Sequence, residues 1–277
     1  MANHESQKEC GAAPPNAATE AFSFPGAGVS ALLIHGLTGT PYDMRYLGER
    51  LSAAEIRAHG VRLAGHARPA EELGATRHAD WYESVVEGFE YLRGRGDPVV
   101  VVGLSMGAML AARLAGDQGE AVAGLVMLAP SLYLRRSVGL AIRLAAALPS
   151  STSLVYLRKT SSDIHDNAAR SVHPSTSFMP IASMLELREL QMVVRPRIRR
   201  ITQPALVIHS RRDHTCPMGA NVDFLMAHLG SAEKRAVILD ESYHVISVDS
   251  EKERVAAEVV QFVAGFRAGG RPVAAEG

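Results

Sequence analysis

The chain has 277 residues, of which 47% are hydrophobic, and its 29 basic residues balance 29 acidic ones. This length suits one large domain with a sizeable core, and zero net charge gives no electrostatic reason to expect a nucleic-acid partner. The two cysteines, Cys10 and Cys216, are too far apart in the chain to suggest a disulfide framework. No apolar signal segment and no uncharged apolar stretch of about eighteen residues occurs, so we expect a cytoplasmic protein.

The predicted elements alternate between apolar runs and amphipathic segments. Residues 1–20 lack periodicity and are expected to form a disordered tail. After it we expect strands near 29–35, 56–63, 98–102, 122–128, 204–209 and 235–239, and helices near 42–54, 80–93, 218–229 and 251–266. This alternation predicts an α/β fold with a mostly parallel sheet, helices on both faces, and a core formed by residues 21–130 and 201–277.

Residues 131–200 interrupt the alternation. They contain helix-like segments near 138–148 and 181–194, separated by a piece rich in Ser, Thr and Asp, with no convincing strand. We interpret this region as a helical cap inserted over the carboxyl edge of the sheet. It has eleven Arg or Lys residues against four Asp or Glu residues. A solvated basic face explains this surplus, and attraction to anionic lipid headgroups or to an acidic substrate is the alternative.

A short motif, Gly103-Leu-Ser105-Met-Gly107, joins an expected strand directly to a segment of good helix formers. In such a sharp strand-to-helix turn the serine hydroxyl stands clear of both flanks, and the glycines remove Cβ atoms that would collide with the neighbouring chain. The G-x-S-x-G pattern alone also arises by chance, so its position between strand and helix matters most. Ser105 is therefore the candidate nucleophile, with a structural Gly-Ser turn as the alternative.

A serine nucleophile needs a base and an acid that orients the base, and in this type of fold they follow in the order Ser, acid, His. Asp213 and His244 each follow an expected strand, and the carboxyl ends of parallel strands are where chemistry collects. Asp240 is the alternative acid, although it lies only four residues before His244. We interpret other histidines near these strands as surface or structural groups: His35, His66, His209 and His214.

The oxyanion of an acyl-transfer reaction needs hydrogen-bond donors, and two main-chain N–H groups are candidates. One belongs to Met106, just after the nucleophile, and the other to Leu37, in the glycine-rich loop after the first expected strand. An ordinary strand-to-helix turn is the alternative role of that loop. Gly26-Ala-Gly28 precedes a strand and is no dinucleotide motif, and metal-binding spacings are absent, so we predict no cofactor and no metal.

Together these residues resemble the bacterial α/β-hydrolase carboxylesterases and monoacylglycerol lipases with a small cap, across nearly all of 28–266. The pieces that carry the resemblance are His35–Pro41, Met44-Arg45, Gly65-His66, Asp80-Trp81, Gly103–Gly107, Arg212-Asp213-His214, Pro217, Ser242–Val245 and Asp249. The resemblance implies the α/β-hydrolase fold, a triad of Ser105, Asp213 and His244, and an oxyanion hole at Leu37 and Met106.

The chain departs from the family pattern at several positions. Leu37 stands where the family usually has a bulky aromatic residue, and Ala67 and Ala108 stand where it has glycines. The family's monoacylglycerol lipases hold glycerol with a cap carboxylate, whereas the corresponding region here centres on His173, preceded by Asp163 and Asp166.

We therefore expect a serine esterase that cleaves short to medium acyl esters, with monoacylglycerols as further candidates, through an acyl-enzyme. Its partner would be a small ester or lipid, with at most peripheral membrane contact through the cap, in a monomer or homodimer. Apolar cap residues would line the acyl channel or simply pack on the core: Leu140, Ile142 and Leu144. A thioesterase or acyltransferase with the same triad, and a non-catalytic receptor on this fold, are the alternatives.

Overall fold

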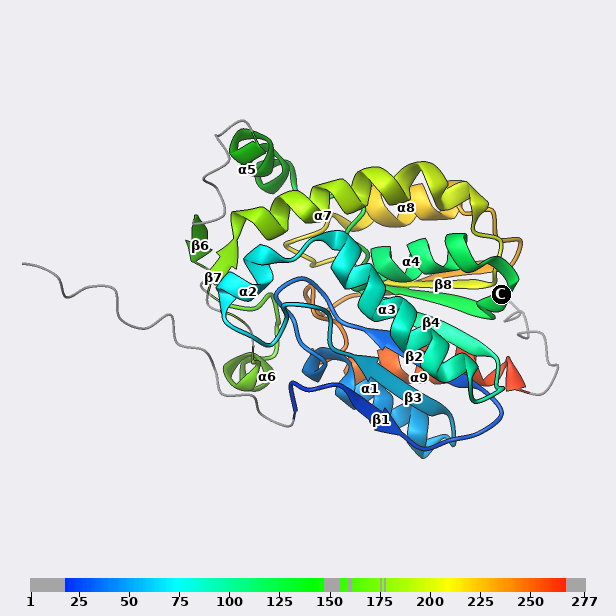
Figure 1. Ribbon diagram of the computed structural model, residues 1–277. Helices are drawn as coiled ribbons and strands as arrows, with labels where there is room; N and C mark the ends of the chain where they lie inside the picture. Colours follow the sequence, from blue (N-terminus) through cyan, green and yellow to red (C-terminus); the bar gives the residue numbers. More distant parts are fainter. Residues whose placement is uncertain (1–17, 147–154, 159–160, 175, 177, 268–277) are drawn as a thin grey trace, which may run out of the picture.

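The computed structural model describes residues 18–146, 155–158, 161–174, 176 and 178–267 (Figure 1). Its strands are β1 (Phe22–Phe24), β2 (Ser30–Ile34), β3 (Arg57–Val61), β4 (Val99–Leu104), β5 (Gly124–Leu128), β6 (Tyr156–Arg158), β7 (Phe178–Pro180), β8 (Ala205–Ser210) and β9 (Lys234–Leu239). Its helices are α1 (Tyr42–Ala53), α2 (Ala70–Ala75), α3 (His78–Arg93), α4 (Met106–Gln118), α5 (Arg136–Ala146), α6 (Asn167–Val172), α7 (Ile181–Val194), α8 (Met218–His228) and α9 (Lys252–Ala264), with 3₁₀ turns η1 (Gly119–Ala121) and η3 (Arg195–Arg200).

Seven strands form the main sheet, in the order β1-β3-β2-β4-β5-β8-β9. All neighbouring pairs are parallel except β1 with β3. Strands β2, β4, β5 and β8 are buried along their whole length, which explains their continuous apolar sequences. The predicted mostly parallel sheet is confirmed, and the short antiparallel edge strand β1 is an addition that the sequence analysis did not anticipate.

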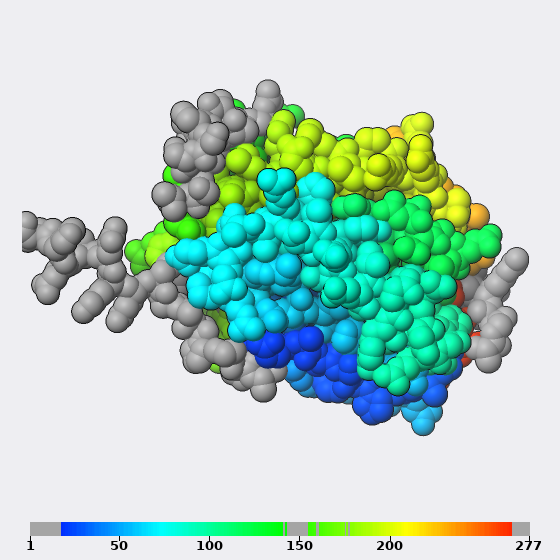
Figure 2. All heavy atoms as spheres, in the orientation of Figure 1, coloured from blue at the N-terminus to red at the C-terminus, as the bar shows by residue number. Residues whose placement is uncertain are grey.

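Helices cover both faces of this sheet, and each face has its own hydrophobic cluster. Leu32 belongs to the cluster that contains α3, α4 and α8, whereas Leu33 belongs to the cluster that contains α1 and α9. Successive strand residues point to opposite faces, so a fully apolar strand supplies both clusters. In the all-atom view of Figure 2, the segments from α2 to α4 close over the face turned toward the viewer.

The segment 131–200 lies between β5 and β8 in the chain and contains α5, α6, α7 and η3. The expectation that it holds no strand was wrong, because β6 pairs antiparallel with β7. Each strand has only three residues, too few to show an alternating pattern. Figure 1 shows α5, α6 and this strand pair gathered at one end of the molecule, while α7 runs back along α4.

The tail predicted for residues 1–20 lies mostly outside the described residues. Its last part is packed, because Thr19 is buried and Glu20 forms a 3.0 Å ion pair with Arg62. Among the described residues, no helix combines the length and the apolar character needed to cross a membrane.

Candidate active site

Ser105 occupies the turn between β4 and α4 with φ 56° and ψ −113°, a conformation that residues with a side chain rarely adopt. The flanking glycines make this turn possible. A Cβ on Gly103 would lie 2.1 Å from the carbonyl oxygen of Gly107, and a Cβ on Gly107 would lie 2.3 Å from that of Ile34. Helix α4 therefore begins in direct backbone contact with the end of β2, and the Ser105 side chain is left facing the carboxyl edge of the sheet.

Two loops at the same edge bring a histidine and an aspartate to this serine. The Oγ atom of Ser105 lies 2.8 Å from Nε2 of His244, in the loop after β9. On the other side of the ring, Nδ1 of His244 lies 2.7 Å from Oδ2 of Asp213, in the loop after β8. Hydroxyl, imidazole and carboxylate thus form one hydrogen-bonded chain, although 139 residues separate Ser105 from His244. Asp240 lies elsewhere, exposed and 2.8 Å from Nε of Arg211.

The Asp213 carboxylate is completely enclosed and has four donors around it. Its Oδ1 atom accepts the main-chain N–H groups of Thr215 and Cys216, each at 2.7 Å. Besides His244, its Oδ2 atom has Nε2 of His209 at 3.2 Å. Burial alone would raise the pKa of this carboxyl, but the charge of His244 and the hydrogen bonds from both histidines outweigh burial and hold the pKa well below its usual range. Asp213 is therefore a fixed carboxylate.

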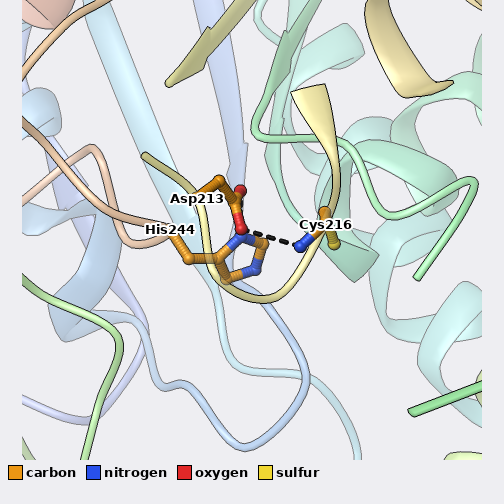
Figure 3. A group of neighbouring side chains, drawn as sticks. All are labelled: Asp213, Cys216 and His244. Atoms are coloured by element: carbon orange, nitrogen blue, oxygen red, sulfur yellow. Dashed lines mark hydrogen bonds and ion pairs between the residues drawn. The ribbon is translucent and has the colours of Figure 1, made fainter. Parts of the chain in front are cut away.

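Asp213, Cys216 and His244 also lie close enough to offer a metal ion three ligand atoms, all within 4.8 Å of one another (Figure 3). Their chemistry fits a metal poorly. Both oxygens of Asp213 already accept hydrogen bonds, and burial raises the pKa of the Cys216 thiol well above its usual range, which disfavours the thiolate that a metal would need. This grouping is better explained by the hydrogen bonds that fix Asp213.

The candidate oxyanion loop passes directly over the serine. A Cβ on Gly36 would lie 3.3 Å from Cβ of Ser105, a tighter contact than most Cβ atoms make, so glycine favours this close approach of the loop. Leu37 lines the cleft beside Ser105, and Met106 begins α4, where the first N–H groups have no partner within the helix. Both residues thus lie near Ser105, and the role of their main-chain N–H groups in binding an oxyanion stays a prediction.

The inserted segment reaches the same loops through Asp163. Its main-chain oxygen accepts the N–H groups of His244 at 3.0 Å and Val245 at 3.1 Å. Its carboxylate accepts the N–H of His214 at 3.0 Å and the hydroxyl of Thr215 at 3.1 Å. One residue of the segment therefore holds both the loop of the histidine and the loop of the aspartate.

A cleft of about 320 Å³ opens above Ser105. Its apolar lining includes Val138 and Ile142 of α5 and Met184 and Leu187 of α7. Its polar lining comes from other elements and includes Asp43, Asp163, His173, His214 and Thr215. Of the three apolar candidates, Ile142 lines the cleft, Leu140 is 57% exposed, and the Leu144 side chain lies outside the described part of the chain.

The buried pair of Asp43 and His173 contributes to the polar part of this cleft. Nε2 of His173 lies 2.8 Å from Oδ1 of Asp43, and Nδ1 of the same ring lies 2.8 Å from the hydroxyl of Ser162. The side chains of the pair are only 2% and 4% exposed. Asp166, by contrast, caps the start of α6 by accepting the N–H groups of Ala168 and Ala169.

Comparison with known proteins agrees with this geometry. The family model described as serine aminopeptidase, S33, matches residues 29–251. The chain belongs to this family. The thermostable monoacylglycerol lipase of Bacillus sp. (strain H-257) is 31% identical over 252 residues, which cover 91% of this chain and 96% of that lipase. The carboxylesterase of Bacillus subtilis (strain 168) is 25% identical over 243 residues, covering 87% and 95% of the two chains.

Solved structures give the same result. One from work on the metagenome-derived lipolytic enzymes LipS and LipT superposes with a TM-score of 0.83 at 28% identity, covering 90% of this hydrolase and 98% of that chain. The monoacylglycerol lipase of Paleococcus ferrophilus has a TM-score of 0.76 at 19% identity, covers 89% and 98%, and supports the fold alone. The protein is an α/β-hydrolase of the esterase and lipase type, which confirms the predicted fold and enzyme class.

One departure of this α/β-hydrolase from the family pattern has a visible structural consequence. Ala67 has φ 56°, a left-handed conformation that favours the glycine usual in the family. Ala108 is fully buried inside α4, where a methyl group is accommodated without strain.

The sequence analysis did not anticipate His209 and Asp163 as neighbours of the candidate triad. His209 was interpreted as a surface or structural group, and its position four residues before Asp213 on a buried strand was the available signal. Asp163 was considered only as a counterpart of the cap carboxylate. Its hydrogen bonds to the loop of His244 join residues far apart in the chain, so no local sequence pattern predicts them.

Proposed function

We propose that this hydrolase cleaves short to medium acyl esters, monoacylglycerols among them, by a two-step route through an acyl-enzyme on Ser105. The observation that carries the proposal is the hydrogen-bonded chain from Ser105 through His244 to Asp213 at the floor of the cleft. The enzyme class supports it, and the residue roles are inferred from the geometry.

In the first step, Ser105 Oγ attacks the ester carbonyl carbon while Nε2 of His244 takes the hydroxyl proton. The carbonyl oxygen becomes an oxyanion, which the N–H groups of Leu37 and Met106 stabilise. As the tetrahedral intermediate collapses, the bond to the alcohol breaks and His244 protonates the departing oxygen. Water then repeats the sequence on the acyl-enzyme, which releases the acid and restores Ser105.

The two kinds of cleft lining support an ester with one apolar and one polar part. Val138, Ile142 and Leu187 offer apolar contacts to an acyl chain. The polar lining of the same cleft, which includes Asp43 and the half-exposed His214, offers hydrogen-bonding groups to a hydroxylated alcohol such as glycerol. A monoacylglycerol combines both parts in one small molecule.

The test is a substrate panel measured with the purified protein. It contains nitrophenyl esters from acetyl to palmitoyl, monoacylglycerols of matched acyl chains, and acyl-CoA thioesters. We expect hydrolysis of the oxygen esters, fastest with short to medium chains, and its loss in Ser105→Ala. Preference for acyl-CoA would favour a thioesterase, and a folded protein that hydrolyses no ester would favour a receptor.

We also propose that any membrane contact of this hydrolase is peripheral and runs through the inserted segment. In the described part of that segment, five large apolar side chains are 41–66% exposed: Leu140, Val155, Leu157, Val172 and Met192. Basic residues of the segment lie in two places: Arg136, Arg158 and Arg170 share α5, β6 and α6 with exposed apolar side chains, whereas η3, which leads to the amino end of β8, contains Arg197, Arg199 and Arg200. Co-sedimentation with anionic vesicles that weakens with salt would support contact, and no co-sedimentation would reject it.

A further inference from the structure

His209 is a buried histidine that the reaction scheme above does not use. It lies on β8, its side chain is fully buried, and it is not among the residues that line the cleft. Its Nε2 atom lies 3.2 Å from Oδ2 of Asp213 and 3.0 Å from the main-chain oxygen of Cys216. Oδ2 is the same carboxylate oxygen that binds His244.

The contacts of the ring assign its proton. Both neighbours of Nε2 are acceptors, a carboxylate and a carbonyl, so Nε2 must carry hydrogen and donate. The other ring nitrogen, Nδ1, is buried and has no hydrogen-bond partner among the residues that the structure describes. A proton there would add an unsatisfied buried donor, so the ring is the neutral tautomer with hydrogen on Nε2.

Packing alone does not explain an imidazole at this position. A leucine would fill much of the same space without burying an unpaired nitrogen. The polar ring is therefore retained at a cost, and two contacts of Nε2 account for it, one with the Asp213 carboxylate and one with the main-chain oxygen of Cys216.

We propose that His209 is a positioning residue of this active site: its Nε2–H donates to Asp213 and thereby fixes the carboxylate and sets the pH at which His244 works as a base. The proposal rests on the proposed function of Ser105, Asp213 and His244. Two imidazoles share Oδ2, so each attracts only part of the negative charge on that oxygen. Without His209, the carboxylate would stabilise a protonated His244 more strongly.

Other titratable groups face this cluster and must be controlled. The Cys216 thiol stays neutral, because burial raises its pKa well above its usual range. Asp163 and His214 lie on the outer side, where Nδ1 of His214 is 2.8 Å from Oδ1 of Asp163. The side chain of His214 is 51% exposed and lies beside this cluster, so a His214 variant is included as a control.

The experiment compares His209→Leu with His209→Gln, measuring kcat and KM for nitrophenyl butyrate across pH. Leucine removes the donor. We expect kcat to fall about 10-fold with little change in KM, because one charge-assisted hydrogen bond is lost. The acid limb of kcat/KM should move to higher pH by about half a unit or more. Glutamine keeps an N–H group and should recover much of both values.

Two controls make the result specific. His228→Leu removes a histidine at the end of α8, where Nδ1 bonds to the main-chain oxygen of Phe224, and should leave kcat and the acid limb unchanged. The shift caused by His209→Leu should persist in a His214→Gln background. A shift that disappears there belongs to His214 and overturns the proposal.

The proposal is also overturned if folded His209→Leu keeps the wild-type kcat and acid limb, or if leucine and glutamine reduce kcat equally without moving the limb. Should His209→Leu fail to fold, nitrogen NMR of the wild-type histidines decides, since hydrogen on Nδ1 of His209 would contradict donation to Asp213. If instead Ser105→Ala retains full activity, the proposed function itself fails, whatever His209 does.

Discussion

The main-chain oxygen of Asp163 lies 3.0 Å from the main-chain nitrogen of His244, so the inserted segment holds the backbone of the candidate base. The neighbouring Ile164 is fully buried in the core. Asp249, itself 1% exposed, accepts the N–H groups of His165 and Asp166 at 2.8 and 2.9 Å. This part of the segment is thus anchored to the loop of the histidine as well as covering the cleft.

The carboxylate of Asp163 holds the loop of Asp213, and from this contact we expect Asp163→Ala to lower kcat about 10-fold or more. Alanine keeps the main-chain hydrogen bond to His244 but removes the acceptor of the N–H of His214 and of the hydroxyl of Thr215. The measurement is kcat on nitrophenyl butyrate together with thermal unfolding. Asp166→Ala is the matched control, since it removes the cap of α6, costs about 1 kcal/mol of stability and leaves kcat unchanged. Equal kcat in both variants would contradict the role of Asp163.

The close approach of α4 to β2 predicts a large cost for Gly107→Ala. The added Cβ would lie 2.3 Å and 2.5 Å from the main-chain oxygens of Ile34 and His35, neither of which can rotate away. We expect the free energy of unfolding in urea to fall by about 3 kcal/mol or more. Gly116→Ala, in the same helix with its nearest contact at 3.9 Å, should raise stability by about 0.5–1 kcal/mol. A tolerated Gly107→Ala would mean that the turn around Ser105 is looser than described.

Acid sensitivity should come in part from His66. Burial lowers its pKa to about 3, and the neighbouring His35 acts in the same direction. Below about pH 6.5 the His66 imidazole therefore binds a proton in the unfolded chain but not in the folded chain, so the free energy of unfolding falls as the pH drops. Integrated down to pH 3, this one group costs about 4 kcal/mol.

The check is the slope of unfolding free energy against pH between about 4 and 6.5. In His66→Asn the amide N–H can replace the donor to the carbonyl of Ala64, and no group titrates, so the slope should decrease even if total stability falls. His228→Asn should leave the slope as in wild type. An unchanged slope in His66→Asn would show that His66 does not titrate as described.

Chain-length preference should depend on Ile142. This side chain is 3% exposed and lines the cleft, whereas Leu140 of the same helix is 57% exposed. Ile142→Trp should lower kcat/KM for decanoyl relative to butyryl esters by about 5-fold or more, because one or two methylenes lose their apolar contact. Leu140→Trp should leave this ratio unchanged. A ratio that changes equally in both variants would place the acyl chain elsewhere.

The main sheet and its helices were predictable because the sequence of each strand and helix has a clear hydrophobic pattern. Strands β4 and β8 are continuous apolar runs, and α9 is amphipathic, so their positions agree with the expected ranges to within a few residues. The candidate triad was also predictable, since each member follows a strand and parallel strands bring their carboxyl ends together. The shortest elements could not be predicted, because β1, β6 and β7 have three residues each.

Contacts across the chain were the other limit. The pairing of Asp43 with His173 joins residues 130 positions apart, and the sequence around either residue does not predict the contact. The contact of His209 with Asp213 is local, yet it depends on how the turn after β8 folds back on the strand. Periodicity locates elements, whereas such contacts require the packed structure.

The most direct test of the central claim is covalent labelling by a fluorophosphonate, with the modified residue identified by mass spectrometry. The account predicts one adduct on Ser105, formed much more slowly in His244→Ala and absent in Ser105→Ala, with ester hydrolysis lowered by about 10⁴-fold or more in both variants. Labelling of a different residue, or full hydrolysis by folded Ser105→Ala, would contradict it.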